Sequence, residues 1–576
     1  MPRFECRGDF KEASLSEKRW NIGQPDSQKQ ILLSDSLGIH PIVAQLLINR
    51  KIDCRDDAAS FLKGDLHDLH DPFLLKDMDL AVARLKVARA AGETVLIYGD
   101  YDVDGVTSSV LLKNLMDQLG IKALNYIPHR MTEGYGLNSR IAEFTKQNAV
   151  SLLIAVDCGI NAFAAVEALN KSGVDVFILD HHEPSAGRLP AAVAIINPKR
   201  ADCPYPFKRL ASVGLAFKLA QAVLGKLPED DLDLVAIGTI ADVVELQGEN
   251  RIFVKQGLPK ISQTKNCGLQ ALLDVAKVKG KKFRPYYVGF ILGPRLNATG
   301  RMGTAQTSLD LLLCENHEEA YALAKNLEEH NTIRQKTQSE MIQEALSIVE
   351  REINFKEHKV IVLNKEGWHR GVLGIVAARI MEKYYRPTIV ISTDGEVGTG
   401  SGRSIEGFHL FEALQACSGI LENFGGHKRA AGLTLKVQRI AELKIIMNEF
   451  ANQNLSLDDL IPSLDIDGEI PLSAINQDLI AALESLEPFG EGNPPPVFCT
   501  RRVKVKSPST IMGKDTLKFW VTDGRVVLPA VGFGMGKYLD TVGFNQWVDL
   551  AYSPSLDEWA GTQTVTLKLK DVRQSP

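Results

Sequence analysis

Short apolar runs along residues 94–180 alternate with acidic turns and with segments of helical period. The runs TVLIYG, SLLIAV and VDVFIL each lead to an aspartate, and helix-like stretches such as SSVLLKNLMDQLG and AFAAVEALNKSG lie between them. β-branched runs of this length, separated by helices, are typical of βαβ units whose parallel sheet is buried on both faces. The pattern predicts an α/β domain with its ligand site at the carboxyl ends of the strands.

The pattern changes twice further along the chain. Residues 316–355 contain strong helix formers and neither Gly nor Pro, which predicts one long helix of about 50 Å that bridges two domains. A second, smaller α/β unit follows, in which KVIVLN and TIVIST flank the helical GVLGIVAARIMEKYY. After Asp458, short alternating segments such as TLKFWVTD and TVTLKLKD, divided by turn residues, predict a small β-barrel.

A chain of 576 residues exceeds what one hydrophobic core usually supports, so several domains are expected. The changes of pattern indicate their boundaries. We expect a lead segment at residues 1–70, a parallel-sheet domain at 71–305, the long helix at 306–355, the smaller α/β domain at 356–455 and the β-barrel at 456–576.

Composition and charge narrow the function classes. Hydrophobic residues make up 45% of the chain and charged residues 24%, which are ordinary values for a folded protein. The polar start and the lack of a long apolar run predict no membrane span, and we expect a cytoplasmic location. Eight cysteines without a Cys-x-x-Cys pair disfavour a disulfide framework. The net charge of −5 gives no global sign of nucleic-acid binding, so any DNA site has to be local.

The strongest chemical signal is GDYDVDG, which places Asp100, Asp102 and Asp104 on alternate positions directly after an apolar run. Alternate side chains of an extended segment share a face, so at least two of these carboxylates repel each other unless a cation lies between them. A divalent metal ion is the natural partner. A solvated turn and a calcium loop are the alternatives, and an EF-hand is excluded because the spaced Glu is missing.

Three later segments add acids and imidazoles. AVDCGI places Asp157 after a strand, where it could equally cap a helix. In ILDHHEP, His181 and His182 directly follow Asp180, and this combination suits manganese or a similar ion. We expect one histidine to be a metal ligand and the other to contact phosphate or to support its neighbour. In AIGTIADVVEL, Asp242 interrupts an almost wholly apolar stretch, where burial of its carboxylate is costly without a charged partner.

Basic residues beside glycines form candidate contacts to a phosphate backbone, because Arg can donate two parallel hydrogen bonds to one phosphate. GSGRS predicts a Gly-rich loop after a strand, which could hold a terminal phosphate or form only a hairpin turn. GGHKRAAG indicates close approach to a nucleic-acid strand, or a helix start with solvated charges. The candidate DNA-contacting residues are Arg130 in IPHRMTEGYG, Arg295, Asn297 and Arg301 in GPRLNATGRMG, Ser401 and Arg403 in GSGRS, and His427, Lys428 and Arg429 in GGHKRAAG.

The order GDYDVDG, VDCG, DHHE and GTIADVVEL resembles the four motifs of the DHH phosphoesterase superfamily. The long helix, GWHRGVLGIVAARI, SGRS and GGHKRAAG resemble its RecJ exonuclease branch, and LEPFGEGNPPP resembles the entry to the C-terminal OB domain of that branch. The resemblance covers nearly the whole chain, although Glu245 stands where relatives often carry Pro. It implies an α/β fold in which a DHH parallel-sheet domain is joined by a long helix to a smaller α/β DHH-associated domain, with a C-terminal OB-type β-barrel.

The resemblance also implies a chemistry. Two divalent ions, Mn²⁺ or Mg²⁺, would clamp the scissile phosphate and activate water for in-line attack. The implied metal ligands are Asp102, Asp104, Asp157, His181 and Asp242, with Asp157 as the bridge and with Asp100 and His182 in close support. The sequence carries no persuasive nucleophile elbow or Walker A motif, which disfavours covalent catalysis and ATP use.

The expected function is that of a single-stranded-DNA-specific exonuclease of recombination and repair, which releases mononucleotides in the 5′ to 3′ direction. The polarity comes from the resemblance alone. The implied partners are single-stranded DNA, a single-stranded-DNA-binding protein and a recombination helicase, and we expect a monomer. Two alternatives stay open: a DHH phosphoesterase that acts on short oligonucleotides or small phosphate substrates, and a non-catalytic scaffold that binds single-stranded DNA.

Overall fold

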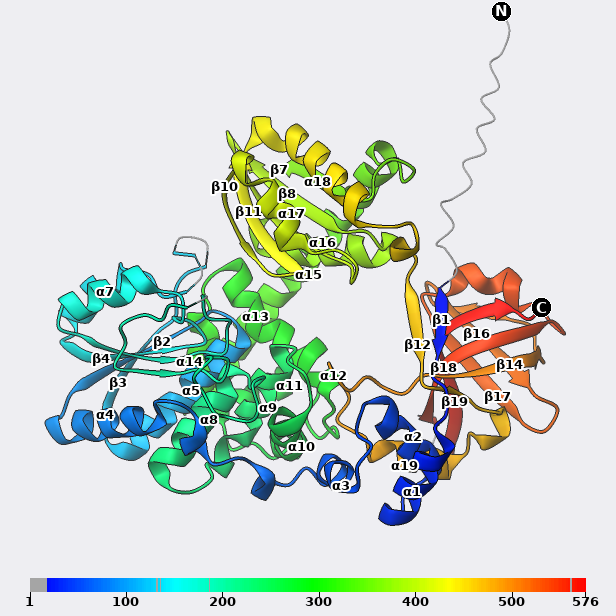
Figure 1. Cartoon of the computed structure of the whole chain (residues 1–576), viewed down its shortest axis with the longest axis horizontal. Coiled ribbons are helices and arrows are strands. Elements are labelled where there is room, and N and C mark those ends of the chain that lie inside the picture. The colour runs from blue at the N-terminus through cyan, green and yellow to red at the C-terminus, as the bar shows by residue number, and fades with distance from the viewer. Residues whose placement is uncertain (1–17, 131–132, 135, 186, 560–561) are drawn as a thin grey trace, which may run out of the picture. The chain divides into compact units, whose positions relative to one another are not determined.

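The computed structural model describes residues 18–130, 133–134, 136–185, 187–559 and 562–576 (Figure 1). The described chain forms two compact units. The larger contains residues 24–333 and 467–576, and the smaller contains residues 334–466 together with the described part of the first 23 residues. The first 17 residues of the predicted lead segment lie outside the described residues.

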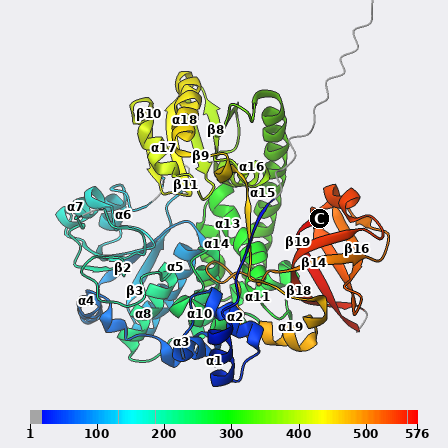
Figure 2. The ribbon, with the colours of Figure 1, turned by 45° about the vertical axis from the view of Figure 1, so that its right-hand side comes forward.

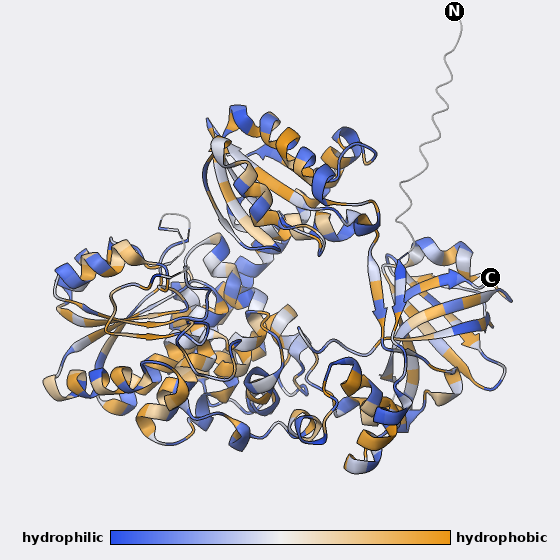
Figure 3. Cartoon of the chain, in the orientation of Figure 1, coloured by the Kyte–Doolittle hydropathy of each residue, from blue (hydrophilic) through white to orange (hydrophobic). Residues whose placement is uncertain are grey.

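The larger unit is built on a five-stranded parallel sheet with the strand order β3-β2-β4-β5-β6. Its strands are β2 (Thr94–Gly99), β3 (Lys122–Tyr126), β4 (Val150–Val156), β5 (Asp175–Leu179) and β6 (Ala194–Ile196). β2, β4 and β5 are almost wholly buried, as their apolar sequences predict, and they are mostly hydrophobic in Figure 3. The register pairs Gly99 with Val156 and Val156 with Leu179, so the carboxyl ends of these three strands lie side by side.

Helices cover both faces of this sheet. α4 (Met78–Ala91), α5 (Val103–Leu119) and α8 (Ser212–Leu224) share a core with Val95 and Ile97 of β2. The intervening Leu96 and Tyr98 belong to a second core, to which α6 (Ile141–Gln147) and α7 (Phe163–Lys171) contribute. Side chains of β2 therefore alternate between the two faces, as an extended strand requires.

A helical region follows the sheet in the sequence and has a third core of its own. Its helices are α9 (Leu232–Ala241), α10 (Gly248–Ile261), α11 (Cys267–Val275), α12 (Pro285–Tyr287), α13 (Gly293–Met302) and α14 (Gln306–Leu313), with one π-helical turn (Val288–Leu292) before α13. The core joins this region to α5 through Val103, Val106 and Val110.

The C-terminal strands close into a barrel. They are β13 (Gly468–Glu469), β14 (Phe498–Val505), β15 (Thr510–Met512), β16 (Thr516–Thr522), β17 (Val527–Phe533), β18 (Trp547–Trp559) and β19 (Thr562–Gln574). The sheet order is β13-β14-β18-β19-β17-β16-β15, and an additional pairing of β14 with β16 completes a ring of five strands. The lead helices α1 (Ser27–Leu37), α2 (Pro41–Asn49) and α3 (Arg55–Lys63) share the barrel core with α19 (Gln477–Glu484).

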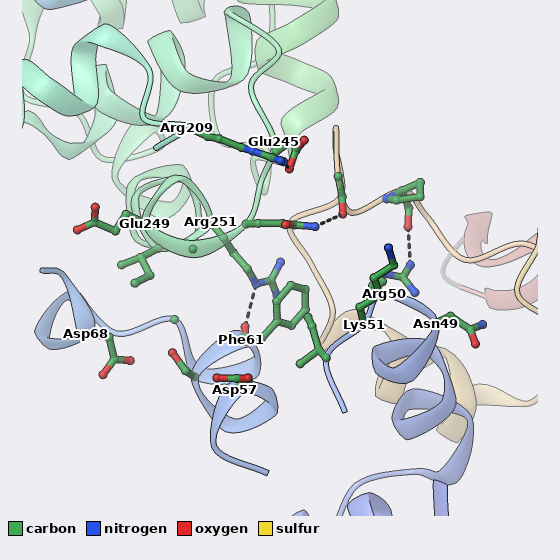
Figure 4. Close-up of a pocket in the computed structure, with 18 of the residues that line it drawn as sticks. Asn49, Arg50, Lys51, Asp57, Phe61, Asp68, Arg209, Glu245, Glu249 and Arg251 are labelled. Carbon is green, nitrogen blue, oxygen red and sulfur yellow. Dashed lines mark hydrogen bonds and ion pairs between the residues drawn. The ribbon is translucent and has the colours of Figure 1, made fainter. Parts of the chain in front are cut away.

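The segment LEPFGEGNPPP, between α19 and β14, is held by arginines (Figure 4). Arg251 of α10 lies 3.7 Å from the ring centroid of Phe61 and donates to the Phe61 carbonyl at 2.8 Å and to the Pro488 carbonyl at 3.2 Å. Arg50, next to α2, donates to the Pro494 carbonyl at 2.8 Å. The entry to the barrel is therefore an anchored segment of the larger unit.

The smaller unit contains a five-stranded mixed sheet with the order β10-β11-β9-β8-β7, in which β7 and β8 alone are parallel neighbours. Its strands are β7 (Ile361–Glu366), β8 (Thr388–Asp394), β9 (Val397–Arg403), β10 (Leu421–Gly426) and β11 (Ala430–Lys436), and its helices include α16 (Leu373–Tyr384), α17 (Leu410–Ala416) and α18 (Ile440–Asn454). β1 (Arg19–Ile22) pairs in parallel with β12 (Ser463–Ile466).

The predicted long helix is α15 (His317–Glu352), which is continuous over 36 residues (Figure 2). At 1.5 Å per residue it is about 54 Å long. Among the described residues, no individual helix combines the length and hydrophobicity needed to cross a bilayer, and only the bent pair α1 and α2 meets that criterion jointly.

Candidate metal centre

The carboxyl end of β2 carries the first three candidate ligands. Asp100 directly follows the strand, Asp102 is the N-cap of α5, and Asp104 lies in the first turn of this helix. The Asp102 carboxylate accepts a hydrogen bond from Gly105 N at 3.1 Å, which satisfies one amide at the helix start. Because Asp100 and Asp104 are only 3% and 1% exposed, GDYDVDG is not a solvated turn.

The neighbouring strand ends add further candidates. β4 leads to Asp157, whose φ of 63° costs a non-glycine residue about 1–3 kcal/mol and is found chiefly where the surroundings fix the backbone at a functional site. It caps no helix, because the N-cap of α7 is Ala162. β5 leads to His181 and its neighbours, whereas Asp242 follows the last residue of α9 and so comes from a helix end.

The structure brings these side chains to one place. His181 Nε2 lies 3.3 Å from Asp157 Oδ1 and 3.7 Å from Asp242 Oδ2. Three groups of residues each offer ligand atoms that lie within 4.8 Å of one another inside the group. The groups are Asp100, Asp102 and Asp157; Asp104, His181 and Asp242; and Asp157, His181 and His182. Asp157 and His181 each belong to two sets, so the cluster offers adjoining metal positions that share ligands.

Without a cation, the carboxylates of this cluster resist ionisation. Burial, and then the charge of Asp102, raises the pKa of Asp104 to about 7. Burial, and then the charge of Asp104, raises the pKa of Asp242 to about 9. Burial and neighbouring carboxylates also raise the pKa values of Asp100 and Asp157. A divalent cation would favour the charged forms of all these groups.

The donor set fits a metal ion. Asp100 Oδ1 is buried and has no hydrogen-bond partner in the part of the chain that the structure describes. His181 Nδ1–H donates to the Leu210 carbonyl at 3.2 Å, which leaves the lone pair of Nε2 on the side of the carboxylates. Burial, and then the charge of His182, lowers the pKa of His181 to about 3, so the ring is neutral. Carboxylate oxygens with one neutral imidazole are ligands that Mn²⁺ and Mg²⁺ accept.

His182 differs from His181 in its partner. Its Nδ1 lies 2.7 Å from Asp180 Oδ1, and the same oxygen accepts from the amide of His182 at 3.0 Å. Although burial opposes it, the hydrogen bond to Asp180 raises the pKa of His182. The hydrogen bond to Asp180 occupies Nδ1 of His182, so Nε2 is the nitrogen left for a phosphate oxygen or a metal ion, and the assignment of His182 to phosphate stays a prediction.

The start of α8 also contacts the cluster, although its sequence contains no acid or imidazole. Its N-cap is Ala211, which offers no side-chain cap. Ser212 N donates to Asp104 Oδ2 at 2.7 Å, and Val213 N donates to Asp104 Oδ1 at 2.8 Å. Ser212 Oγ donates to Asp157 Oδ1 at 2.8 Å. These contacts could not be predicted from the sequence, because a serine at the start of an apolar helix carries no chemical signal.

Two of the candidate DNA-contacting arginines lie near Tyr101, which comes between Asp100 and Asp102 in the sequence. The Arg130 guanidinium is 4.9 Å from the centroid of the Tyr101 ring. Burial raises the pKa of Tyr101 to about 12, and the charges of Arg130 and Arg301 work against that rise. Both arginines therefore lie near the acid cluster.

Arg295 and Asn297 lie with Arg301 in α13, so the glycines beside these residues mark no turn. The glycines of GPRLNATGRMG are accommodated within and at the end of a packed helix, where tertiary contacts outweigh their weak helix propensity. Arg295 Nε lies 2.5 Å from Glu328 Oε2 of α15. This ion pair holds α13 to α15, and a contact between Arg295 and DNA stays a prediction.

In the smaller unit, Ser401 and Arg403 lie in β9 and not in the predicted Gly-rich loop. Their strand pairs with β11, where Gly432 is opposite Ser401. The alternating glycines of VGTGSGR misled the prediction, since in this sheet they lie against large side chains of neighbouring elements. Arg403 Nη1 donates to Ser401 Oγ at 3.2 Å, and a Cβ on Gly374 would lie 2.6 Å from Arg403 Nη2. Gly374 thus allows Arg403 to lie against the first turn of α16.

The residues His427, Lys428 and Arg429 form the turn between β10 and β11, and all three are exposed. This segment is a hairpin, so the alternative of a helix start is excluded. Ser404 N donates to the Arg429 carbonyl at 2.9 Å, which ties the turn to the end of β9 beside Arg403. The structure therefore brings the five candidate contacts of the smaller unit together.

Family models match three parts of the chain. Residues 94–239 match the DHH family N-terminal domain, residues 357–453 match the DHHA1 domain, and residues 466–571 match the RecJ OB domain. The single-stranded-DNA-specific exonuclease RecJ of Bacillus subtilis (strain 168) is 39% identical over 563 residues, which cover 97% of this chain and 71% of the relative. The chain belongs to the RecJ family.

Two solved structures extend the comparison. RecJ from Thermus thermophilus in complex with Mn²⁺ matches with a TM-score of 0.84 and 28% identity, over 97% of this chain and 80% of the solved chain. RecJ from the same organism in complex with Mg²⁺ matches with a TM-score of 0.77 and 26% identity, over 97% and 79% of the two chains. With the sheet orders and the closed barrel, these matches confirm the predicted fold class and the RecJ resemblance.

Proposed function

We propose that this chain degrades single-stranded DNA from the 5′ end and releases mononucleotides by hydrolysis with two divalent metal ions, Mn²⁺ or Mg²⁺. The observation that carries the proposal is the convergence of five carboxylates and two imidazoles in three overlapping sets of possible ligands. The proposed ligands are Asp102, Asp104, Asp157, His181 and Asp242, with Asp100 and His182 in support. The relatives named as single-stranded-DNA-specific exonucleases support the substrate class.

Two bound ions would supply Lewis-acid activation of the phosphate and of water. The chain itself orients the ligands. The Leu210 carbonyl holds the His181 ring so that Nε2 is the ligating nitrogen. Asp180 holds the His182 ring through Nδ1, so Nε2 is the nitrogen that can reach a phosphate oxygen. No side-chain nucleophile is required.

The candidate DNA-contacting residues of the smaller unit support the proposed 5′ to 3′ direction of degradation. Arg403 with the Ser401 hydroxyl, beside the first turn of α16, offers convergent donors for a terminal 5′-phosphate. The turn at His427, Lys428 and Arg429 adds exposed basic residues beside this position. In the larger unit, Arg130, Arg295, Asn297 and Arg301 are the proposed contacts to the rest of the strand.

The barrel exposes aromatic side chains that suit stacking with the bases of a single strand. Trp520 and Trp547 are 39% and 51% exposed, and Lys504 Nζ lies 5.9 Å from the centroid of the Trp547 ring. Exposed aromatic rings beside a cation suit stacking on single-stranded bases without selection for sequence. This supports a grip on single strands by the barrel.

The role and the protein partners rest on the family resemblance, whereas the location and the oligomeric state are expectations from the sequence. We propose a role in recombination and repair, a single-stranded-DNA-binding protein and a recombination helicase as partners, a monomeric chain and a cytoplasmic location. The two alternative functions, a phosphoesterase of small substrates and a non-catalytic scaffold, are separated from the proposal by the following experiment.

The first experiment measures nucleotide release from single-stranded DNA labelled at either end, and from blunt duplex, with Mn²⁺, with Mg²⁺ and with chelator. We expect metal-dependent release of mononucleotides from the 5′ end of single strands. Asp104→Ala should lower the rate by about 10²-fold or more, because loss of a ligand should exceed the 10–100-fold effects of outer partners.

Asp117→Ala is the matched control, because Asp117 lies on the same helix with an exposed carboxylate paired to Lys113. It should keep the rate of the unchanged protein. Tight binding of single strands without release under any metal would favour the scaffold. Hydrolysis of short oligonucleotides alone would favour the small-substrate phosphoesterase.

A further inference from the structure

Ser212 is the side chain through which the start of α8 reaches the candidate metal cluster. Its side chain is wholly buried, and Oγ donates to Asp157 Oδ1 at 2.8 Å. The same carboxylate oxygen lies 3.3 Å from His181 Nε2. Because Asp157 belongs to two of the three ligand sets, the orientation of its carboxylate affects both metal positions.

The backbone amides of the same helical turn contact a different carboxylate, that of Asp104. Ala211 provides no side-chain cap, so the Asp104 carboxylate accepts from the amides of Ser212 and Val213. Gly238 of α9 lies on the other side of this carboxylate, where a Cβ would be 3.2 Å from Asp104 Oδ1. Asp104 is therefore positioned by main-chain groups and by close packing, and it does not need the Ser212 hydroxyl.

Asp157, in contrast, needs a side-chain partner. It lies in a turn with a positive φ, which the chain adopts only where other contacts fix it. Its backbone amide donates to the Leu179 carbonyl at 2.9 Å, whereas among the described residues its carboxylate contacts the Ser212 hydroxyl and the His181 ring. His181 Nε2 carries a lone pair and does not donate, so the Ser212 hydroxyl is the donor that orients the Asp157 carboxylate.

We propose that Ser212 is a positioning residue of the metal centre, which holds the shared ligand Asp157 through one hydrogen bond. The assignment of the cluster to metal-dependent hydrolysis rests on the proposed function, whereas the effect of Ser212 on metal binding does not. Outer partners that orient a metal ligand typically change metal affinity by about 10–100-fold.

The test compares Mn²⁺ binding to the full chain and to Ser212→Ala by isothermal titration calorimetry. The substitution removes the hydroxyl and leaves both amide contacts to Asp104. We expect the dissociation constant of at least one Mn²⁺ site to rise by about 10-fold or more. In the nuclease assay, the Mn²⁺ concentration for half-maximal rate should rise, while the KM for single-stranded DNA stays unchanged.

Ser108→Ala is the matched control, because Ser108 of α5 is also wholly buried and its hydroxyl has no hydrogen-bond partner among the described residues. Its Mn²⁺ affinity should equal that of the unchanged chain, and thermal unfolding should show both variants folded at the assay temperature. Unchanged Mn²⁺ affinity in Ser212→Ala, or an equal loss in Ser108→Ala, would overturn the proposal. A weaker Mn²⁺ site in a chain without nuclease activity would instead overturn the proposed function alone.

Discussion

Two buried polar clusters involve α8, one at its first turn and one at its middle, and their buried carboxylates are neutralised in different ways. At the middle of the helix, Lys218 Nζ lies 2.6 Å from Glu249 Oε1, and Tyr205 donates to Glu249 Oε2 at 2.6 Å. The His70 amide also donates to Glu249 at 3.0 Å, and its carbonyl accepts from Lys218 at 2.7 Å. In this cluster the chain supplies the cation for its own buried carboxylate.

The cluster at the start of α8 contains more carboxylates and fewer groups that neutralise their charge. Its acids receive hydrogen bonds from the Ser212 hydroxyl and from amides, and in the described residues no Lys or Arg forms an ion pair with them. Asp100 Oδ1 has no partner there. The comparison teaches that burial of an acid does not by itself indicate a functional site. Several carboxylates buried together without a cation from the chain do, because their mutual repulsion is then relieved by a cation from outside.

The largest expected effect on stability comes from removing the internal cation. Lys218→Met leaves Glu249 buried and unpaired, which should lower the free energy of unfolding by about 3–5 kcal/mol. Chemical denaturation followed by circular dichroism measures this loss. Hydrogen exchange should show faster exchange in α8 and α10. Nuclease activity per folded molecule should be retained, because neither residue contacts the metal cluster.

A double variant tests the reason for this loss. Lys218→Met with Glu249→Leu replaces the pair by apolar side chains and should recover most of the stability. If the double variant were no more stable than Lys218→Met alone, the unpaired Glu249 carboxylate would not be the cause of the loss and the comparison would fail.

The next largest effect is the gain in stability when Mn²⁺ binds the carboxylates at the start of α8. At a free Mn²⁺ concentration of about 100 times its dissociation constant, the unchanged protein should gain about 2.7 kcal/mol of stability, and chelator should remove the gain. Asp104→Asn should lose the gain, because it removes a proposed ligand, and its metal-free form should lose one of the two amide hydrogen bonds of the Asp104 carboxylate. Thermal unfolding with and without Mn²⁺ measures both. An equal Mn²⁺ effect in Asp104→Asn would place the ion elsewhere.

The sequence predicts the acid cluster because its residues follow strand-like runs in a parallel sheet, and neighbouring parallel strands end at the same edge. Asp100, Asp157 and His181 meet for this reason. Ser212 and Lys218 could not be predicted in the same way. Both belong to a helix whose contacts depend on how it packs on the sheet, and a serine or a lysine in such a helix is ordinarily a surface residue.

The errors have a related cause. The glycines of GSGRS predict a loop, yet β9 accommodates them because the adjacent strands and helices supply large side chains. The glycines beside the arginines of α13 mark no turn, because packing makes the segment helical. Local sequence signals of flexibility are weak wherever tertiary contacts compensate for them.

The smallest effect concerns a buried carboxylate that has neither a lysine nor a metal position. Asp231, before α9, is 8% exposed and accepts a hydrogen bond from Asn114 Nδ2 at 2.8 Å. Burial raises its pKa from 3.8 to about 6, against the effect of that hydrogen bond. The folded chain therefore binds this proton more tightly than the unfolded chain does, and stability falls as the pH rises from about 4 to about 6.

Asp231→Asn should remove this pH-dependent cost. The amide keeps an oxygen that can accept from Asn114 and carries no charge to desolvate. The variant should be more stable than the unchanged protein by about 1–2 kcal/mol at pH 7, and the difference should shrink below about pH 4, where Asp231 is protonated in both states. Denaturant midpoints measured in chelator at pH 4, 5.5 and 7 follow the difference. A constant difference across this range, or a variant less stable at pH 7, would show that Asp231 is compensated by the chain in the manner of Glu249.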